Sequence, residues 1–164
     1  MESEIPEAFA EMGHIYRLGQ FGVVQSDKKA AKLYKRGVEL GNVDSMLSLG
    51  SFYMDGRAVK YDIKKGMKLL RMAADKGHAL AQSNVATGLI RQEKWEESIH
   101  YLKLAASQGF LDAQCNLGVS YARGDGIEVD LEEARRWWNR AAEKGHPTAI
   151  ECLRQLNSQL NRNA

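Results

Sequence analysis

The chain has 164 residues, 44% of them apolar and 27% charged, which is enough for one domain with a buried core and is typical of an ordinary soluble protein. Its formal net charge of +2 gives no broad electrostatic footprint for nucleic acid or for a membrane surface. No apolar run approaches the roughly 18 residues of a membrane span, and the acidic N-terminus lacks the apolar core of a signal peptide, so we expect a cytoplasmic or nuclear protein that is not secreted.

Apolar periodicity and helix-capping residues predict helices throughout, with no strand. Glycines follow the second helix of each repeating pair at positions 41, 77, 109 and 145, where a left-handed residue ends a helix. Ser26, Asp62 and Asp130 are suitable N-caps, whereas Lys94 at the equivalent place is a poor one. The expected helices cover residues 6–18, 27–40, 44–55, 63–76, 79–91, 95–108, 112–123, 131–144 and 147–160.

The helix expected at 131–144 shows the local pattern most fully. Asp130, followed three residues later by Glu133, has the spacing of a capping box. Apolar residues then recur at i, i+3, i+4 and i+7, and they predict a buried stripe made of Ala134, Trp137, Trp138 and Ala141. We expect Trp137→Ala to be among the most damaging single changes.

The chain repeats itself. Residues 45–53 align with residues 113–121, and Asp62 aligns with Asp130, at a constant offset of 68. One intervening unit separates these two copies and another precedes them, which indicates four helix-pair repeats near 8–44, 45–80, 81–112 and 113–148. The helix at 147–160 would then cap the last repeat. A fixed period in this range predicts an all-α solenoid forming a single domain over residues 1–164.

The fourth repeat carries a recognisable motif: Leu117-Gly118, Tyr121, Gly124, Gly126, Asp130, Ala134, Trp137, Ala141-Ala142 and Gly145-His146. This pattern is similar to the Sel-1-like repeat, a relative of the tetratricopeptide repeat, and the resemblance extends over about residues 8–148. It implies a right-handed α/α superhelix that scaffolds other proteins and, for most members, has no catalytic activity. A secreted branch that binds β-lactams carries a cysteine pair in every repeat, which this chain does not.

No motif favours catalysis, a cofactor or a metal. Cys115 and Cys152 occupy non-equivalent repeat positions, so we expect two reduced structural cysteines. His14 and His100 lack a Cys/His cluster that would make a zinc site. His78 and His146 share one repeat position, and we expect them to be structural. We therefore expect a protein that is not an enzyme.

Function is expected on the first helix of each repeat, because these helices line the concave surface in this architecture. The register places eight polar residues there: His14, Arg17, Ser51, Asn84, Thr87, Arg91, Asn116 and Arg123. In tetratricopeptide domains, asparagines and basic residues at such places hold a peptide's backbone and carboxylates. Asparagine pairs with a peptide group in both directions, and arginine forks onto a carboxylate. The expected partner is a protein or peptide segment, acidic or with a free C-terminal carboxylate, and not nucleic acid.

Two functions stay open at this point. The first is a non-catalytic adaptor that binds a partner segment in its groove. The second is a structural or regulatory repeat region of a larger protein, for example one with a ubiquitin-ligase or kinase domain. An ordinary solvated groove without a ligand is an equally open interpretation of the eight residues.

Overall fold

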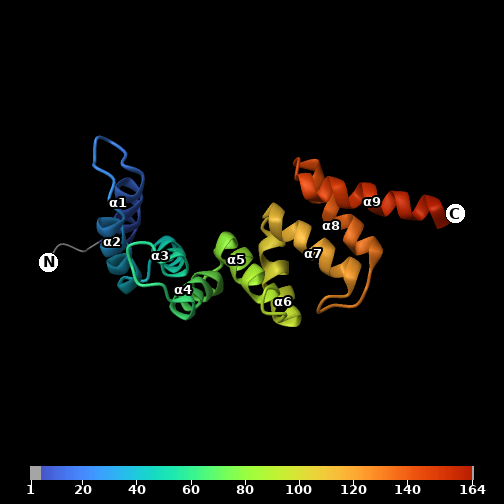
Figure 1. Ribbon diagram of the computed structural model, residues 1–164, viewed down its shortest axis with the longest axis horizontal. Coiled ribbons are helices and arrows are strands. Elements are labelled where there is room, and N and C mark those ends of the chain that lie inside the picture. The colour runs from blue at the N-terminus through green and yellow to red at the C-terminus, as the bar shows by residue number, and fades with distance from the viewer. Residues whose placement is uncertain (1–4, 164) are drawn as a thin grey trace. The chain divides into compact units, whose positions relative to one another are not determined.

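The computed structural model describes the backbone of residues 5–163 and the side chains of residues 5–159. Over that range the chain forms helices only, and Figure 1 shows them in order: α1 (Pro6–Leu18), α2 (Asp27–Glu39), α3 (Val43–Asp55), α4 (Ile63–Asp75), α5 (Ala79–Ile90), α6 (Trp95–Ser107), α7 (Leu111–Arg123), α8 (Leu131–Glu143) and α9 (Pro147–Asn163). The predicted boundaries agree within one residue except at the last, where α9 continues three residues further. None of these helices is both long and apolar enough to cross a membrane.

The helices group into two compact units, Met1–Ala81 and Gln82–Ala164, and the division falls within α5. In the first unit α1 packs on α2 and α3 on α4, while α2 also contacts α3. In the second unit α7 packs between α6 and α8, and α8 packs on α9. Repeats one, two and four therefore form helix pairs, α1 with α2, α3 with α4 and α7 with α8, and α9 packs on α8 as expected for a capping helix.

The core of the first unit is built around Tyr34, which is fully buried and meets Phe52 edge to face at 5.5 Å between ring centres. Tyr34 lies directly against Gly13, where a Cβ would overlap its ring. In the second repeat, Gly50 meets Gly66, and a Cβ on Gly66 would lie 2.8 Å from the carbonyl oxygen of Gly50. Glycines at these places therefore let the paired helices approach closely.

In the second unit the same role falls to Gly118 and Trp138. A Cβ on Gly118 would lie 2.5 Å from Nε1 of Trp138, whose indole is 5% exposed. Its ring N–H donates to the carbonyl of Cys115 at 3.1 Å. The prediction that Trp137 lies in the buried stripe was therefore wrong, because the buried face of α8 consists of Ala134, Trp138 and Ala141. Trp137 is only partly buried and stacks beneath the guanidinium of Arg140 at 4.6 Å.

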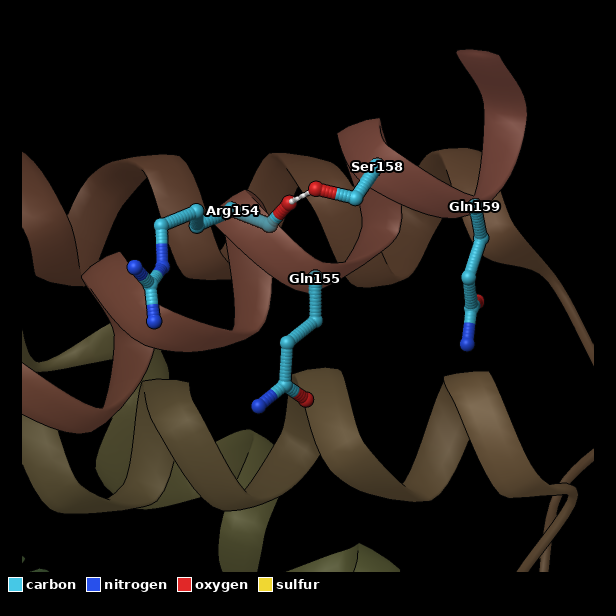
Figure 2. Close-up of a pocket in the computed structure, with 4 residues that line it drawn as sticks. All are labelled: Arg154, Gln155, Ser158 and Gln159. Carbon is cyan, nitrogen blue, oxygen red and sulfur yellow. Dashed lines mark hydrogen bonds between the residues drawn. The ribbon is translucent and has the colours of Figure 1, made fainter. Parts of the chain in front are cut away.

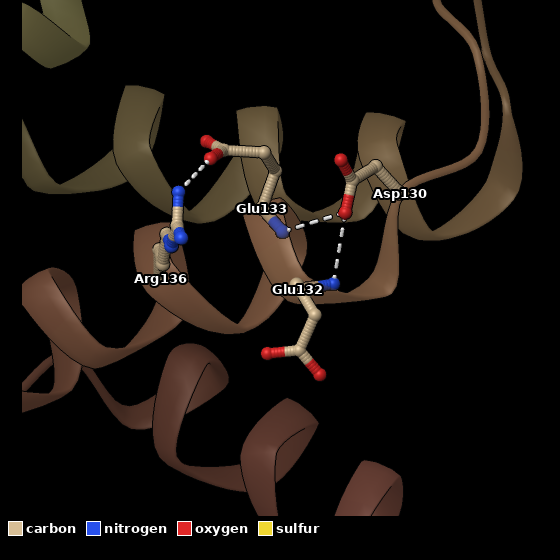
Figure 3. A network of polar contacts seen from close by, with 4 residues as sticks. All are labelled: Asp130, Glu132, Glu133 and Arg136. Carbon is tan, nitrogen blue, oxygen red and sulfur yellow. Dashed lines mark hydrogen bonds and ion pairs between the residues drawn. The ribbon is translucent and has the colours of Figure 1, made fainter.

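The N-caps are formed largely as predicted. Ser26 accepts the Lys29 N–H at 3.3 Å, Asp62 accepts the Lys65 N–H at 3.0 Å, and Asp130 accepts those of Glu132 and Glu133 at 3.0 and 2.9 Å. Figure 3 shows that the carboxylate of Glu133 turns to Arg136 instead of returning to the cap. The Asp130 N–H already donates to the Tyr121 carbonyl, so the expected capping box is only half formed.

The second helix of the third repeat, α6, lacks a good N-cap. Lys94 precedes α6 and makes no side-chain capping hydrogen bond. Glu93 before it has φ +58°, a left-handed conformation that costs a residue with a side chain free energy. Phe21 and Ala58, in the loops of the first two repeats, also have positive φ, at +54° and +56°. What sets the start of α6 apart is therefore the missing side-chain cap, as the poor N-cap Lys94 indicated.

Two histidines join neighbouring repeats in the same way. Nδ1 of His78 accepts the Ala81 N–H at 3.3 Å, and Nδ1 of His146 accepts the Ala149 N–H at 3.3 Å. The other ring nitrogen of each lies close to an aspartate near the start of the preceding first helix, Asp44 at 3.3 Å and Asp112 at 3.0 Å. Their expected structural role is therefore to cap one helix and to tie it to another.

Candidate functional site

Seven of the eight predicted residues lie on α1 and α3 in the first unit and on α5 and α7 in the second, and Arg91 lies in the turn directly after α5. Each unit therefore presents its own set of polar side chains on its first helices, with His14, Arg17 and Ser51 on one and the remaining five on the other.

In the first unit, His14 is engaged with the core. Its Nδ1 lies 3.2 Å from the hydroxyl of Tyr34, and the two rings meet edge to face at 5.4 Å. Burial lowers the pKa of His14, the positive charge of Arg17 lowers it further, and Asp44 opposes both. Burial raises the pKa of Tyr34, and a hydrogen bond with Arg17 opposes that shift. His14 and Arg17 therefore form one cluster around a buried phenol.

The two hydroxyl residues bond within their own helices. Ser51 Oγ donates to the Leu47 carbonyl at 3.1 Å, and Thr87 Oγ1 donates to the Ser83 carbonyl at 3.0 Å. Both side chains are half-buried. Each hydroxyl thus already donates its hydrogen bond within its own helix, and it can only accept a hydrogen bond from a ligand.

The remaining four residues are less constrained. Asn84 and Asn116 are half-buried, whereas Arg91 and Arg123 are exposed. Within the part of the chain whose side chains are described, neither amide has a hydrogen-bond partner and neither guanidinium has an ion pair. These groups can bind a ligand without breaking an existing contact.

A cavity of about 250 Å³ adjoins Arg123. Its lining comes from three helices of the second unit: Val119, Ala122 and Arg123 of α7, Leu131 and Trp138 of α8, and Cys152, Gln155, Leu156 and Gln159 of α9. Trp138 and Leu156 are 5% and 6% exposed and form an apolar floor, and Arg123 with the two glutamines supplies polar groups. The cavity suits an apolar side chain that stands next to a negatively charged group.

The contribution of α9 was missed from the sequence. Gln155 and Gln159 take the repeat positions of Val119 and Arg123, 36 residues further along the chain. Figure 2 shows both glutamine side chains pointing from α9 toward the neighbouring helix. A second hollow of about 320 Å³ is lined by Arg154, Gln155, Ser158 and Gln159. The signal was the repeat register itself, which extends through α9.

The cysteines belong to the core of the second unit. Cys115 is buried, Cys152 is half-buried, and both are free thiols. Burial raises the pKa of Cys115 to about 11, and Cys152 and Asp112 add to the shift. A thiol with such a pKa stays protonated near neutral pH and is a poor nucleophile. Among the residues described, no group of three or more His, Cys, Asp or Glu is placed to hold a metal ion.

The chain is similar in sequence to curated proteins that are named as regulators or as a binding protein. The chain is 29% identical over 158 residues to the chitin synthase regulator SKT5 of Saccharomyces cerevisiae, a match covering 92% of this chain and 23% of that protein. It is 34% identical over 95 residues to the DAP3-binding cell death enhancer 1 of Mus musculus, covering 57% of this chain and 19% of that protein. The chain thus spans less than a quarter of the length of either relative.

Among solved structures, a Sel1 repeat protein from Oxalobacter formigenes matches with a TM-score of 0.84 and 26% identity, over 90% of this chain and 62% of that one. The family described as Sel1 repeat matches residues 6–42, 43–78, 96–110 and 111–146, with its shortest match in the degenerate third repeat. The expected all-α repeat fold is confirmed by this likeness. The chain belongs to the Sel1 repeat family.

Proposed function

We propose that this protein is a non-catalytic adaptor that binds an extended segment of a partner protein along its first helices. Sel1 repeat proteins generally mediate protein–protein interaction, and the relatives are named as regulators or as a binding protein. The observation that supports this site is that Asn84, Arg91, Asn116 and Arg123 have no polar partner among the described residues, and that the last of them lines the cavity between α7, α8 and α9.

The chemistry of this set suits a peptide. The amides of Asn84 and Asn116 occupy equivalent repeat positions, and each offers both a donor and an acceptor to a peptide group. Arg91 and Arg123 are likewise equivalent and offer forked donors to carboxylates. A partner segment would lay its backbone along the two asparagines and direct its acidic groups to the two arginines.

The cavity next to Arg123 limits the kind of ligand further. Its apolar floor of Trp138 and Leu156 can accommodate an aliphatic side chain, and Arg123 can bind a carboxylate at the same place. A chain terminus with an aliphatic last residue brings both groups together. The ligand of this unit is therefore acidic or ends in a free carboxylate.

A second candidate is a repeat region that regulates a larger protein of which it is part. The observation in its favour is that the chain corresponds to only 23% of the chitin synthase regulator to which it is similar. In that case the same groups on α5 and α7 would bind a segment of the same polypeptide. The two functions differ in whether the ligand is supplied in trans.

The test is a selection of displayed peptides with free C-termini, followed by calorimetric titration of the selected peptides. Arg91→Glu combined with Arg123→Glu should weaken binding at least about a hundredfold, since each charge-assisted hydrogen bond contributes about 1.5–3 kcal/mol. Amidating the peptide's C-terminus should also weaken it. Thermal stability should change little, because both arginines are exposed.

The matched control is Lys103→Glu with Arg140→Glu. Both residues are exposed on α6 and α8, so the net charge changes equally while the first helices stay intact. Equal loss in both double variants would show that binding follows only net charge, and unchanged affinity in the arginine variant would remove the site from α5 and α7.

A further inference from the structure

The near balance of the whole chain conceals an uneven distribution of charge. In the first unit, α2 carries lysines at 28, 29 and 32, and α4 carries lysines at 64, 65 and 68, which is one 36-residue repeat later. At the first two of these positions the second unit has acidic residues, Glu96 and Glu97 on α6 and Glu132 and Glu133 on α8. The second helices of the two units therefore begin with opposite charge.

The lysines stand where helix chemistry disfavours them. The first two lysines of each helix follow the N-caps Ser26 and Asp62 in the first turn, where the helix dipole favours acidic side chains, and the third lysine lies about one turn further on. Glutamates at the equivalent places of α6 and α8 obey that preference. Residues that disfavour their local structure are found most often at functional positions. We therefore expect the repeated lysines to bind a partner and not to stabilise the helix.

Four of these lysines are available to a partner. Lys28, Lys32, Lys64 and Lys68 are exposed and, within the described residues, make no ion pair. The acidic side chains beside them are already occupied: Asp27 faces Arg57 at 3.9 Å and Asp62 faces Lys65 at 3.6 Å. The positive charge of the four lysines is therefore not neutralised from within the unit.

Large apolar side chains are exposed in the loops before the same helices and at the first residue of α4. Phe21 and Val24 are 86% and 85% exposed, and Tyr61 and Ile63 are 61% and 46% exposed. Figure 1 shows the loop between α1 and α2 reaching beyond the ends of those helices. Antiparallel helix pairs place both loops at one edge of the unit, and the contact of Arg57 with Asp27 joins the second loop to the start of α2. We call the four lysines and these four apolar residues the basic edge.

We propose that the basic edge binds the surface of an anionic lipid bilayer. The apolar side chains would enter the boundary between headgroups and acyl chains, and the lysines would lie among anionic headgroups, each adding about a fivefold gain in binding. Aliphatic Val24 and Ile63 decide between a membrane and single-stranded nucleic acid, because they cannot stack on bases but readily bury in lipid. This surface is separate from the first-helix groups of the proposed adaptor function.

The second unit supplies an internal control. Val129 and Leu131 are 57% and 43% exposed at the edge equivalent to Tyr61 and Ile63. They are surrounded by acidic side chains, and Figure 3 shows Asp130, Glu132 and Glu133 gathered at the start of α8. Arg136 takes the repeat position of Lys68 here, but it is paired with Glu133. The apolar component of this edge is therefore flanked by three carboxylates and by no unpaired basic residue at the positions of the four lysines, so an anionic bilayer would repel it.

The test is sedimentation of the whole chain with phosphatidylcholine vesicles, either pure or containing about a third phosphatidylserine. Binding should require phosphatidylserine and weaken as salt is raised. Lys28→Glu with Lys64→Glu should lower binding at least about 25-fold. Folding is not at risk in this variant, because glutamate is the residue that the second unit has at those positions.

Two further variants complete the design. Lys103→Glu with Arg140→Glu changes the net charge equally and should leave binding within about twofold of the unmodified chain. Phe21→Ser with Val24→Ser should lower binding while Val129→Ser with Leu131→Ser does not. The proposal is overturned by equal binding to both kinds of vesicle, by equal loss in the two charge variants, or by binding to single-stranded DNA without binding to vesicles.

Discussion

Trp138→Ala probes the packing on which the second unit depends. The indole is 5% exposed, lies against Gly118 and donates a hydrogen bond to the Cys115 carbonyl at 3.1 Å. Replacing a buried tryptophan with alanine costs about 3–5 kcal/mol through lost burial and the cavity left behind. Because a buried hydrogen bond is lost as well, we expect the upper end of that range, about 4–5 kcal/mol.

Trp137→Ala is the matched comparison on the same helix. Its ring is partly exposed, and its contact with Arg140 is a cation–π interaction of about 0.5–1 kcal/mol. We expect a total loss near 1 kcal/mol. The two variants thus differ by about 3 kcal/mol although the same atoms are deleted one residue apart.

Urea denaturation measures both losses. All three tryptophans of the chain lie in the second unit, so intrinsic fluorescence reports that unit, and circular dichroism reports the whole chain. Trp95 and one further indole remain in each variant as the probe. Equal free energies of unfolding for the two variants, or a greater loss for Trp137→Ala, would refute the assignment of Trp138 to the buried face of α8.

Four further outcomes are expected. Asp130→Ala should cost about 1 kcal/mol in urea denaturation, because two N–H groups lose their cap, whereas Lys94→Ala should cost almost nothing; equal costs would contradict the capping assignment. Glu93→Gly should raise the melting temperature by relieving φ +58°, a gain of about 0.5–1 kcal/mol, and a lower melting temperature would contradict this. The lowered pKa of His14 means that the unfolded chain binds its proton first, so stability should fall as pH drops below 6.5, and less so in His14→Gln; urea midpoints measured across that pH would show it, and identical profiles would not fit. Alkylation of Cys115 near neutral pH should be much slower in the folded chain than in urea, because burial raises its pKa to about 11, and equal rates would contradict its burial.

Helix boundaries were predictable because each repeat contains residues that start and end its helices. Gly41, Gly77, Gly109 and Gly145 all have positive φ just after a second helix, a conformation that glycine adopts without cost. Asp62 and Asp130 cap the helices that follow them, as their spacing indicated. These signals are local, so sequence alone locates them well.

The choice between Trp137 and Trp138 was not predictable in the same way. Both fall within the apolar stripe of α8, since adjacent helical residues differ by only about 100° around the axis. What decides between them is the partner helix, where Gly118 leaves room for one ring only. The half-formed capping box at Asp130 has a similar cause, because the N–H that Glu133 would have bonded is taken by Tyr121 on α7.

The candidate site was predictable in register but not in detail. The repeat alignment places Asn84 with Asn116 on first helices, and both amides are unpartnered among the described side chains. It could not show that Thr87 bonds to the Ser83 carbonyl, since any helical threonine has that choice. The cavity beside Arg123 needed the three-dimensional packing of α9, whose register resembles a fifth first helix.

The most direct test of peptide binding on the first helices follows the side-chain amides by NMR. A selected acidic peptide with a free C-terminus is titrated into isotopically labelled protein. The side-chain resonances of Asn84 and Asn116 should shift with one common affinity, while Asn139, exposed on α8, serves as the reference and stays in place. Saturating peptide that shifts resonances of α6 and α8 and leaves Asn84 and Asn116 unmoved would contradict a binding site on the first helices.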